Sequence, residues 1–289
     1  MRLASSTDDT CANASAADTS LTTTRTPDEI RGAGEGVLFN CLQWLRFLTL
    51  ISACGDAGLA AAQAPLRIVT EELPPYNMTL DGRVTGMSTE VVQAVLKEIG
   101  LDASIQIMPW ARAYELALQE SNVLIYSISR TPEREPLFRW VGTIAPTKWY
   151  IYSLADRPVK LNSLSDARGH QIATVNRDVG EQYLVSKGFR IGTELQSSNK
   201  YEQNYRKLKV DHVELWISNE LNALYLTRQN GEDPDKLLIR SLELPELSQG
   251  GLSMAFSVGT SAETVEKFRS GLEAIRRNGV YDGILRKWL

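Results

Sequence analysis

The sequence has no cysteine after Cys54 and holds only two histidines, His170 and His212. Residues 55–289 therefore cannot form a disulfide, bind a metal through sulfur or use a thiol as a nucleophile. The two histidines are far apart in the chain and do not have the spacing of metal ligands. We interpret both as surface or structural residues, and we expect no metal site, no catalytic residue and no cofactor.

A surplus of basic residues and a long apolar run are also lacking. The chain has 31 Lys and Arg against 35 Asp and Glu, and its net charge of −4 gives no electrostatic footprint for nucleic acid. The apolar stretch within residues 37–54 is too short and too interrupted to span a bilayer as a helix. Hydrophobic residues make up 43% of the chain and charged residues 23%, as in a soluble globular protein with one large or two modest domains.

The first 64 residues have the composition of an extension and an export signal rather than of a folded domain. Residues 1–36 are rich in Ser, Thr, Ala, Asp and Gly. Such a segment has too little apolar surface to offset the entropy of ordering, so we expect it to be disordered. Alternatively, it lies upstream of the true start of translation.

Residues 37–64 resemble a secretion signal. Arg46 precedes a short apolar run, and small residues of the kind that a signal peptidase requires follow that run. We expect cleavage near residues 60–64 and a periplasmic protein. Two alternatives stay open. The segment Ile51–Cys54 resembles a lipobox, in which Cys54 would be lipidated, and the apolar run could instead be a buried helix of a cytoplasmic protein.

After the first 64 residues, segments with strand-like and helix-like patterns alternate. Helices are marked by a 3.6-residue apolar period and by end signals: Ser88 before one helix, Gly100 after it, and the capping box Thr260–Glu263 before another. Thr131 and Pro132 occupy the first positions of a further expected helix. The pattern predicts mostly parallel sheets in two α/β halves, covered by helices on both faces. The expected strands are 66–70, 103–107, 123–128, 172–175, 213–217 and 252–257, and the expected helices are 88–99, 110–119, 179–187, 220–228, 260–275 and 281–288.

Four groups of residues carry a resemblance to a known family. They are Pro74–Tyr76, the Asp-Gly turn with a second glycine and an acidic helix start at 81–90, Ser127–Arg134 with Phe138 and Pro146 after it, and the closing segment Gly279–Trp288. Together they are similar to the type II periplasmic solute-binding proteins, specifically the amino-acid-binding family 3. The resemblance covers about residues 65–289.

The resemblance implies an α/β fold of two lobes joined by two hinge crossings, with an interlobe ligand cleft at the carboxyl ends of strands. It places lobe 1 at 65–150 and 249–289, lobe 2 at 151–248, and the crossings near 148–156 and 246–256. The lobes would close over a small polar, amino-acid-like ligand by a hinge motion. The implied partners are that ligand and an ABC permease, with a monomer as the expected state.

Arg134 matches the family arginine that holds a ligand α-carboxylate. The implied contact is a bidentate, charge-assisted pair, a geometry that lysine cannot supply. Ser127 and Ser129 occupy the small polar positions beside it, where a hydroxyl or a backbone group would bind the same carboxylate. Their alternative role is simply to lead into the next helix.

Tyr76 and Trp110 correspond to places where the family presents aromatic side chains to the ligand. We expect them to be walls of the cleft, although an aromatic side chain also suits a core. Arg112 follows on the same segment as Trp110, and it would either reach the cleft or lie on the surface.

Lobe 2 contributes a helix N-terminus and departs from the family at one position. Asp178 precedes the helix whose amides face the carboxylate in the family, and we interpret it as the N-cap. Where the family commonly has an aspartate for the ligand's ammonium, this sequence has Asn219, which brings no charge. The charge would come from Glu220, or from Glu71 or Glu72 in lobe 1, or the ligand is not a standard α-amino acid.

Two other functions remain open. A secreted enzyme on the same fold, similar to the cyclohexadienyl dehydratases, would need a positioned acid, for which Glu220 or Glu72 could serve. The sequence shows no fuller catalytic constellation, so we expect a binding protein and not an enzyme. A sensory module that reports its ligand to a separate membrane signalling partner is the second alternative, and likeness of fold does not separate it from a transport protein.

Overall fold

The computed structural model describes residues 64–289. The disorder, the export signal and the lipidation of Cys54 that the sequence predicts fall almost wholly on residues 1–63, which lie outside the described residues. In the described part of the chain, no helix has the length and the apolar character needed to cross a membrane.

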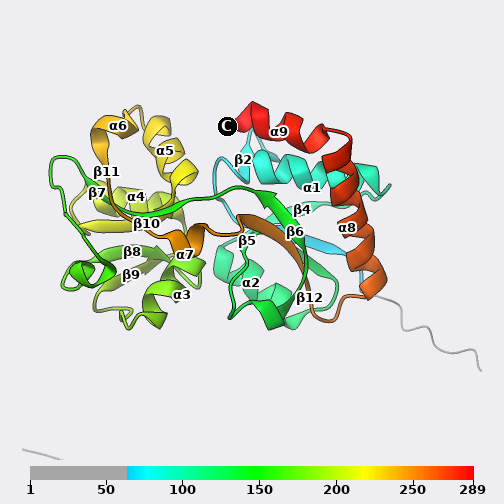
Figure 1. Ribbon diagram of the computed structural model, residues 1–289, viewed down its shortest axis with the longest axis horizontal. Coiled ribbons are helices and arrows are strands. Elements are labelled where there is room, and N and C mark those ends of the chain that lie inside the picture. Colours follow the sequence, from blue (N-terminus) through cyan, green and yellow to red (C-terminus); the bar gives the residue numbers. More distant parts are fainter. Residues whose placement is uncertain (1–63) are drawn as a thin grey trace, which may run out of the picture. The chain divides into compact units, whose positions relative to one another are not determined.

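The first sheet and its helices form lobe 1 (Figure 1). Its elements are β1 (Arg67–Thr70), α1 (Met87–Glu98), β4 (Ile105–Ile107), α2 (Trp110–Gln119), β5 (Val123–Ser129), β6 (Phe138–Ala145), β12 (Leu252–Ser257), α8 (Ala262–Arg277) and α9 (Val280–Trp288). The strand order is β4-β1-β5-β12-β6. β1 is parallel to β4 and β5, whereas β12 is antiparallel to β5 and β6. The sheet is therefore mixed rather than mostly parallel.

Alternate residues of β1 point to opposite faces of this sheet and meet different helices. Ile68 belongs to the same buried cluster as Val91 of α1 and Phe268 of α8. Its neighbour Val69 belongs to the cluster that contains Ala113 of α2. Helices α1 and α8 thus cover one face of the sheet and α2 covers the other, as the sequence pattern predicts.

The second sheet and its helices form lobe 2. Its elements are β7 (Trp149–Leu154), η3 (Leu164–Ala167), β8 (Ile172–Val175), α3 (Val179–Ser186), β9 (Leu195–Ser198), α4 (Tyr201–Lys209), β10 (Leu215–Asn219), α5 (Glu220–Gln229), α6 (Pro234–Leu237), β11 (Leu238–Glu243) and α7 (Pro245–Ser248). The strand order is β11-β7-β10-β8-β9. β8 is parallel to β9 and β10, and β7 is antiparallel to β10 and β11. The two sheets give the two-lobed α/β architecture expected from the sequence.

The chain passes between the sheets twice, at 146–148 and at 244–251. The first passage lies ahead of the segment 148–156, most of which forms β7 within the second sheet. The second passage ends at Gly251, which has φ +68°, and a Cβ at this position would overlap the backbone oxygen of Ala145. Only glycine fits, because the end of the second passage approaches the end of β6 backbone to backbone at this point.

A short hairpin follows β1. Its strands are β2 (Met78–Leu80) and β3 (Arg83–Thr85), which pair antiparallel. Asp81 and Gly82 both have positive φ, 50° and 73°, as a tight two-residue hairpin turn requires. The turn that the sequence predicts at Asp81 and Gly82 is confirmed.

Three local predictions are wrong. Ser88 does not cap α1, whose N-cap is Gly86, without a side-chain cap. The capping box at Thr260 does not form, because the Ser261 hydroxyl, one residue later, accepts the Thr264 amide and caps α8. The helix expected from Thr131 onward is a turn followed by the short 3-10 helix η2 (Glu135–Leu137). Pro136 has no backbone N–H to donate to the Pro132 oxygen, and its ring would clash with that oxygen, so an α-helix cannot continue through it.

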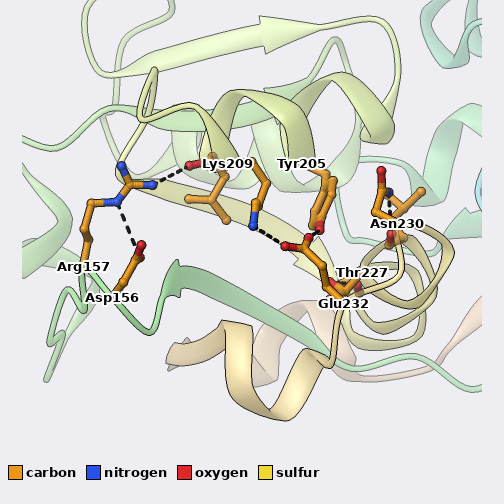
Figure 2. A network of polar contacts seen from close by, with 10 residues as sticks. Asp156, Arg157, Tyr205, Lys209, Thr227, Asn230 and Glu232 are labelled. Carbon is orange, nitrogen blue, oxygen red and sulfur yellow. Dashed lines mark hydrogen bonds and ion pairs between the residues drawn. The ribbon is translucent and has the colours of Figure 1, made fainter.

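A half-exposed polar cluster ties the end of α4 to the loop after α5 (Figure 2). Glu232 accepts a hydrogen bond from the Tyr205 hydroxyl and pairs with Lys209. These donors lower the pKa of the Glu232 carboxyl group. We call these three residues the α4 cluster, in which one carboxylate faces one cation.

Candidate functional site

The carboxyl ends of the lobe 1 strands meet the first turns of lobe 2 helices. The indole nitrogen of Trp110, in lobe 1, donates to the backbone oxygen of Arg177, in lobe 2, at 2.9 Å. The Arg177 side chain pairs with Glu115 on α2. Asn222 of α5 donates to the Pro74 oxygen at 2.8 Å. The two lobes are therefore in direct contact at the place where the sequence predicts a cleft.

Arg134 lies at this boundary and is only 1% exposed. Its guanidinium group is within 5.4 Å of the ring centre of Trp110 and within 5.1 Å of that of Tyr114. Burial lowers the pKa of the guanidinium group, but arginine stays charged in proteins. The two rings restrict the side chain, so the charged fork is held in one place before any ligand arrives.

The fork of Arg134 is directed toward lobe 2. Both Nε and Nη2 donate to the side-chain oxygen of Gln182 on α3, at 3.1 and 2.9 Å. Nη1 donates to the Ser129 backbone oxygen at 3.3 Å, and Nη2 also reaches the Arg177 oxygen at 3.4 Å. The Nε and Nη2 edge is the one that binds a carboxylate bidentately, so Gln182 places an oxygen acceptor where a carboxylate would bind.

The turn after β5 brings Arg134 inward. The backbone nitrogen of Arg134 donates to the backbone oxygen of Thr131 at 3.1 Å and lies 3.3 Å from its hydroxyl. The chain then continues through η2 into β6. Arg134 is therefore held between the end of β5 and the start of β6.

Two carboxylates are buried at the same boundary. Glu71, directly after β1, is 3% exposed, and Asp178, directly before α3, is 6% exposed. Burial raises the pKa of both groups; the charge of Asp178 raises that of Glu71 further, and Arg134 counteracts both shifts. Asp178 is the N-cap of α3, as predicted, and accepts the Val179 amide at 2.6 Å.

Tyr201, the first residue of α4, completes this group by donating its hydroxyl hydrogen to Asp178. Its pKa is raised by burial and by the neighbouring carboxylates, so it stays neutral. We call Glu71, Arg134, Asp178 and Tyr201 the interlobe cluster. Sequence reasoning missed Tyr201 because α4 was not predicted, and no local pattern pointed to it.

The other predicted small polar residues are buried near strand ends. Ser127 donates to the Asn77 side chain, while the Ser129 hydroxyl has no partner among the described residues. Asn219 is the N-cap of α5, and its oxygen accepts the Asn222 amide at 3.0 Å. The Asn219 side-chain nitrogen has no partner within residues 64–289. This residue can therefore donate a hydrogen bond to a ligand.

Tyr76 and Trp110 are both buried, and each has a partner for its polar atom. The Tyr76 hydroxyl donates to the Pro146 oxygen at 3.0 Å, in the first passage between the lobes. Burial raises the pKa of this hydroxyl, so it remains a neutral donor. Trp110 lies against Arg134, and Tyr76 belongs to the core beside the connection.

Three predicted residues lie apart from the interlobe cluster. Arg112 is exposed on α2. Glu72 accepts hydrogen bonds from the backbone and the hydroxyl of Thr79, which fastens the hairpin to the end of β1. Glu220 pairs with Arg240 at 2.9 Å. The structure therefore gives Glu72 and Glu220 local partners, whereas Glu71 is buried.

Two cavities border the interlobe cluster. One of about 490 Å³ is lined by Tyr114 and Arg134 from lobe 1 and by Gln182 from lobe 2. Another of about 280 Å³ is lined by Glu71 from lobe 1 and by Lys200 from lobe 2. The site can therefore combine a fixed cationic fork, buried carboxylates and two cavities that they line. Among the described residues, no group of side chains could hold a metal ion.

Comparison with known proteins agrees with this architecture. Residues 66–289 match the bacterial extracellular solute-binding proteins, family 3. The arginine-binding extracellular protein ArtP of Bacillus subtilis (strain 168) is 18% identical over 246 residues, which cover 82% of this chain and 92% of ArtP.

Two solved structures share the fold at 20% sequence identity. A histidine kinase sensor domain similar to periplasmic binding proteins has a TM-score of 0.68 and covers 78% of this chain and 96% of its own. An ancestral arginine-binding protein bound to arginine has a TM-score of 0.67, with coverage of 78% and 97%. The family match spans most of the chain, so the family expected from the sequence is confirmed. This protein belongs to the bacterial extracellular solute-binding proteins, family 3, a family of binding proteins rather than enzymes.

Proposed function

We propose that the protein captures a small polar, amino-acid-like solute between its two lobes by hinge closure and passes it to an ABC permease. The observation that carries this proposal is the geometry of Arg134. A buried guanidinium group is held by aromatic rings at the lobe boundary, and its bidentate edge meets a single oxygen acceptor from the opposite lobe. A ligand carboxylate would replace the Gln182 oxygen at that edge.

Other groups would complete the carboxylate site. The Ser129 hydroxyl is buried beside Arg134 and has no partner among residues 64–289. The first amides of α3 lie on the lobe 2 side, where a helix N-terminus favours an anion. Contacts from both lobes to one ligand would stabilise the closed arrangement, because the ligand then binds that arrangement better than the open one.

The experiment is a thermal-shift screen of the full chain against amino acids, small peptides, polyamines and organic acids. The wild type is compared with Arg134→Lys, which keeps the charge but lacks the fork. A ligand at a hundred times its dissociation constant adds about 2.7 kcal/mol to stability, enough for a clear melting shift. We expect an unconverted amino-acid-like compound to stabilise the wild type and to lose most of that effect in the variant. Equal stabilisation of both, or consumption of the ligand, would contradict the proposal.

We infer that the ligand is delivered to a permease because relatives of this protein belong to ABC transporters. The competing function is to report the ligand to a signalling partner. The fold is shared with a kinase sensor domain, so the fold alone does not separate the two. Deletion of the gene would lower uptake of the labelled ligand in the first case. In the second, uptake would be unchanged and a ligand-dependent transcriptional response would be lost.

Export would place the protein where it meets such a ligand. Residues 37–64 would direct it to the periplasm, with cleavage near 60–64 or lipidation at Cys54. The mass of the mature protein separates these two routes, since a lipidated product begins at Cys54 and carries acyl chains. A product that retains residues 1–36 would contradict both.

A further inference from the structure

We propose that the cleft is built for a ligand that carries a net positive charge, such as a basic amino acid, rather than for a neutral or acidic one. This inference rests on the proposed function, because it assigns the charge of the ligand that the same cleft would capture. It is carried by the balance of buried charges in the interlobe cluster and by the position of one carboxylate that has no protein donor.

The interlobe cluster holds two carboxylates against one cation. Glu71, Asp178 and Arg134 are each at least nine-tenths buried, and Tyr201 is a neutral hydroxyl. With both carboxylates ionised, the group carries one surplus negative charge. A surplus charge is costly in a buried site, and a partner of opposite charge removes most of that cost. A ligand with one net positive charge would balance these four residues. The nearby buried Glu181 adds a further negative charge, and the Thr174 hydroxyl and the Arg177 amide donate to it.

The two carboxylates are not equally engaged. Asp178 accepts the Val179 amide and the Tyr201 hydroxyl, so its oxygens already have donors. Glu71 accepts a hydrogen bond only at its backbone oxygen, from Asn77 at 2.6 Å, and no described residue donates to its carboxylate. Buried carboxylates in folded proteins normally have donors, so Glu71 is the group that awaits one.

Arg134 does not fill this need. Its donors go to Gln182 and to two backbone oxygens, and it forms no ion pair with a carboxylate among the described residues. In agreement, the pKa of Glu71 is raised by burial and by Asp178 despite the opposing effect of Arg134. The unpartnered nitrogen of Asn219 is itself a donor, so it cannot accept a hydrogen bond from an ammonium group.

Space for a cationic group lies next to Glu71. The cavity of about 280 Å³ is lined by Glu71 and, at its rim, by Glu72 and the exposed Lys200. The rim thus has one charge of each sign, and water screens both. The buried wall of the cavity is acidic, which fits a guanidinium or ammonium group extending from a ligand whose carboxylate is held at Arg134.

The test compares ligands of similar shape and different charge. Isothermal titration of the full chain with arginine and citrulline, and with ornithine and glutamine, gives two pairs that differ mainly in one positive charge. We expect the cationic member of at least one pair to bind roughly 30-fold or more tightly than its neutral partner, in line with the cost of unpairing a buried charge. Glutamate should bind more weakly than either.

Three variants test whether the interlobe cluster causes the preference for cationic ligands. Glu71→Gln should reduce the preference for the cationic ligand at least about tenfold, as expected when one buried charge pair is lost. Asp178→Asn should reduce it less, and it retains the helix cap, since asparagine is also a good N-cap. Glu232→Gln is the matched control, because it makes the same change beside a tyrosine and a cation outside the cleft, and it should leave the ratio unchanged.

The outcomes separate this inference from the proposed function. If neutral or acidic amino acids bind as tightly as cationic ones, the inference is wrong and the proposed function stands. If no amino acid binds but agmatine or putrescine does, the charge assignment stands and the amino-acid reading falls. If no cation of either kind binds, the inference is overturned; Glu71→Gln with an unchanged ratio overturns it as well.

Discussion

Helix α4 carries two tyrosines one turn apart, and each donates to a carboxylate in a different setting. Tyr205 donates to Glu232 in the α4 cluster, where Lys209 supplies the matching cation and water reaches the group (Figure 2). Tyr201 donates to Asp178 in the interlobe cluster, whose residues are each at least nine-tenths buried and which holds a second carboxylate. The same donor on the same helix thus takes part in two opposite kinds of site.

The two clusters shift the pKa of their carboxyl groups in opposite directions. In the α4 cluster, hydrogen bonds from Lys209 and Tyr205 lower the pKa of Glu232. In the interlobe cluster, burial raises the pKa of Glu71 and Asp178. The first arrangement is complete within the protein, whereas the second is left with more charge than the protein itself compensates. A stable ion pair and a binding site are distinguished here by charge balance and solvent access, not by residue types.

The largest expected effect comes from removing Arg134, the buried cation of the interlobe cluster. Arg134→Ala should lower the free energy of unfolding by about 3–5 kcal/mol, because two carboxylates would be left at the boundary without it. Urea denaturation measures the loss. Adding Glu71→Gln to this variant should restore part of the stability; a double variant no more stable than the single one would show that the two charges do not interact.

An intermediate effect of opposite sign is expected from Glu71→Gln alone. Without ligand at about pH 8, this variant should be more stable than the wild type by about 1–3 kcal/mol, because it removes a buried carboxylate that has no donor. The folded pKa of Glu71 lies above the ordinary value of 4.5. Wild-type stability from this group is therefore full below that value and is lost as pH rises through the folded pKa. Between about pH 4.5 and pH 8, the melting temperature of the wild type should fall more steeply with rising pH than that of Glu71→Gln. Parallel curves for the two proteins would contradict the raised pKa of Glu71.

The smallest effect is expected in the α4 cluster. Glu232→Gln should cost no more than about 1 kcal/mol, since the pair is partly exposed and screened by solvent. The stabilisation by Glu232 depends on pH in the opposite direction to that by Glu71. The folded pKa lies below 4.5, so the stabilisation is present above that value and lost as pH falls through the folded pKa. Chemical denaturation at about pH 7 and pH 3.5 tests this, and a loss as large as that of Arg134→Ala would remove the distinction between the two clusters.

Several buried strands and most helices are predicted from the sequence, although the buried strands β6 and β7 are not. The helix at 110–119 and the strands at 172–175 and 252–257 have the expected bounds. The strands β9 and β11 were not predicted, because both lie at sheet edges and their half-exposed polar residues lack a strand-like alternation. The helix start signal at Thr131 and Pro132 fails because Pro136, four residues after Pro132, cannot donate the hydrogen bond that an α-helix needs there.

Only some residues of the candidate site can be predicted from the sequence. Arg134, Trp110 and Asp178 lie in local motifs, so sequence reasoning places them at the cleft. Gln182 becomes part of the site only when lobe 2 meets lobe 1, and Tyr201 only when the start of α4 reaches Asp178 within lobe 2. Their role depends on contacts between segments far apart in the chain, which no local pattern records.

The hydrogen bond from Trp110 to Arg177 gives the protein its own optical reporter. This indole is 1% exposed and belongs to lobe 1, while its acceptor belongs to lobe 2. Separation of the lobes would break the bond and bring water to the ring, so the fluorescence emission of Trp110 would move to longer wavelength. The arrival of a solute could then be followed in real time without attaching a dye to the molecule.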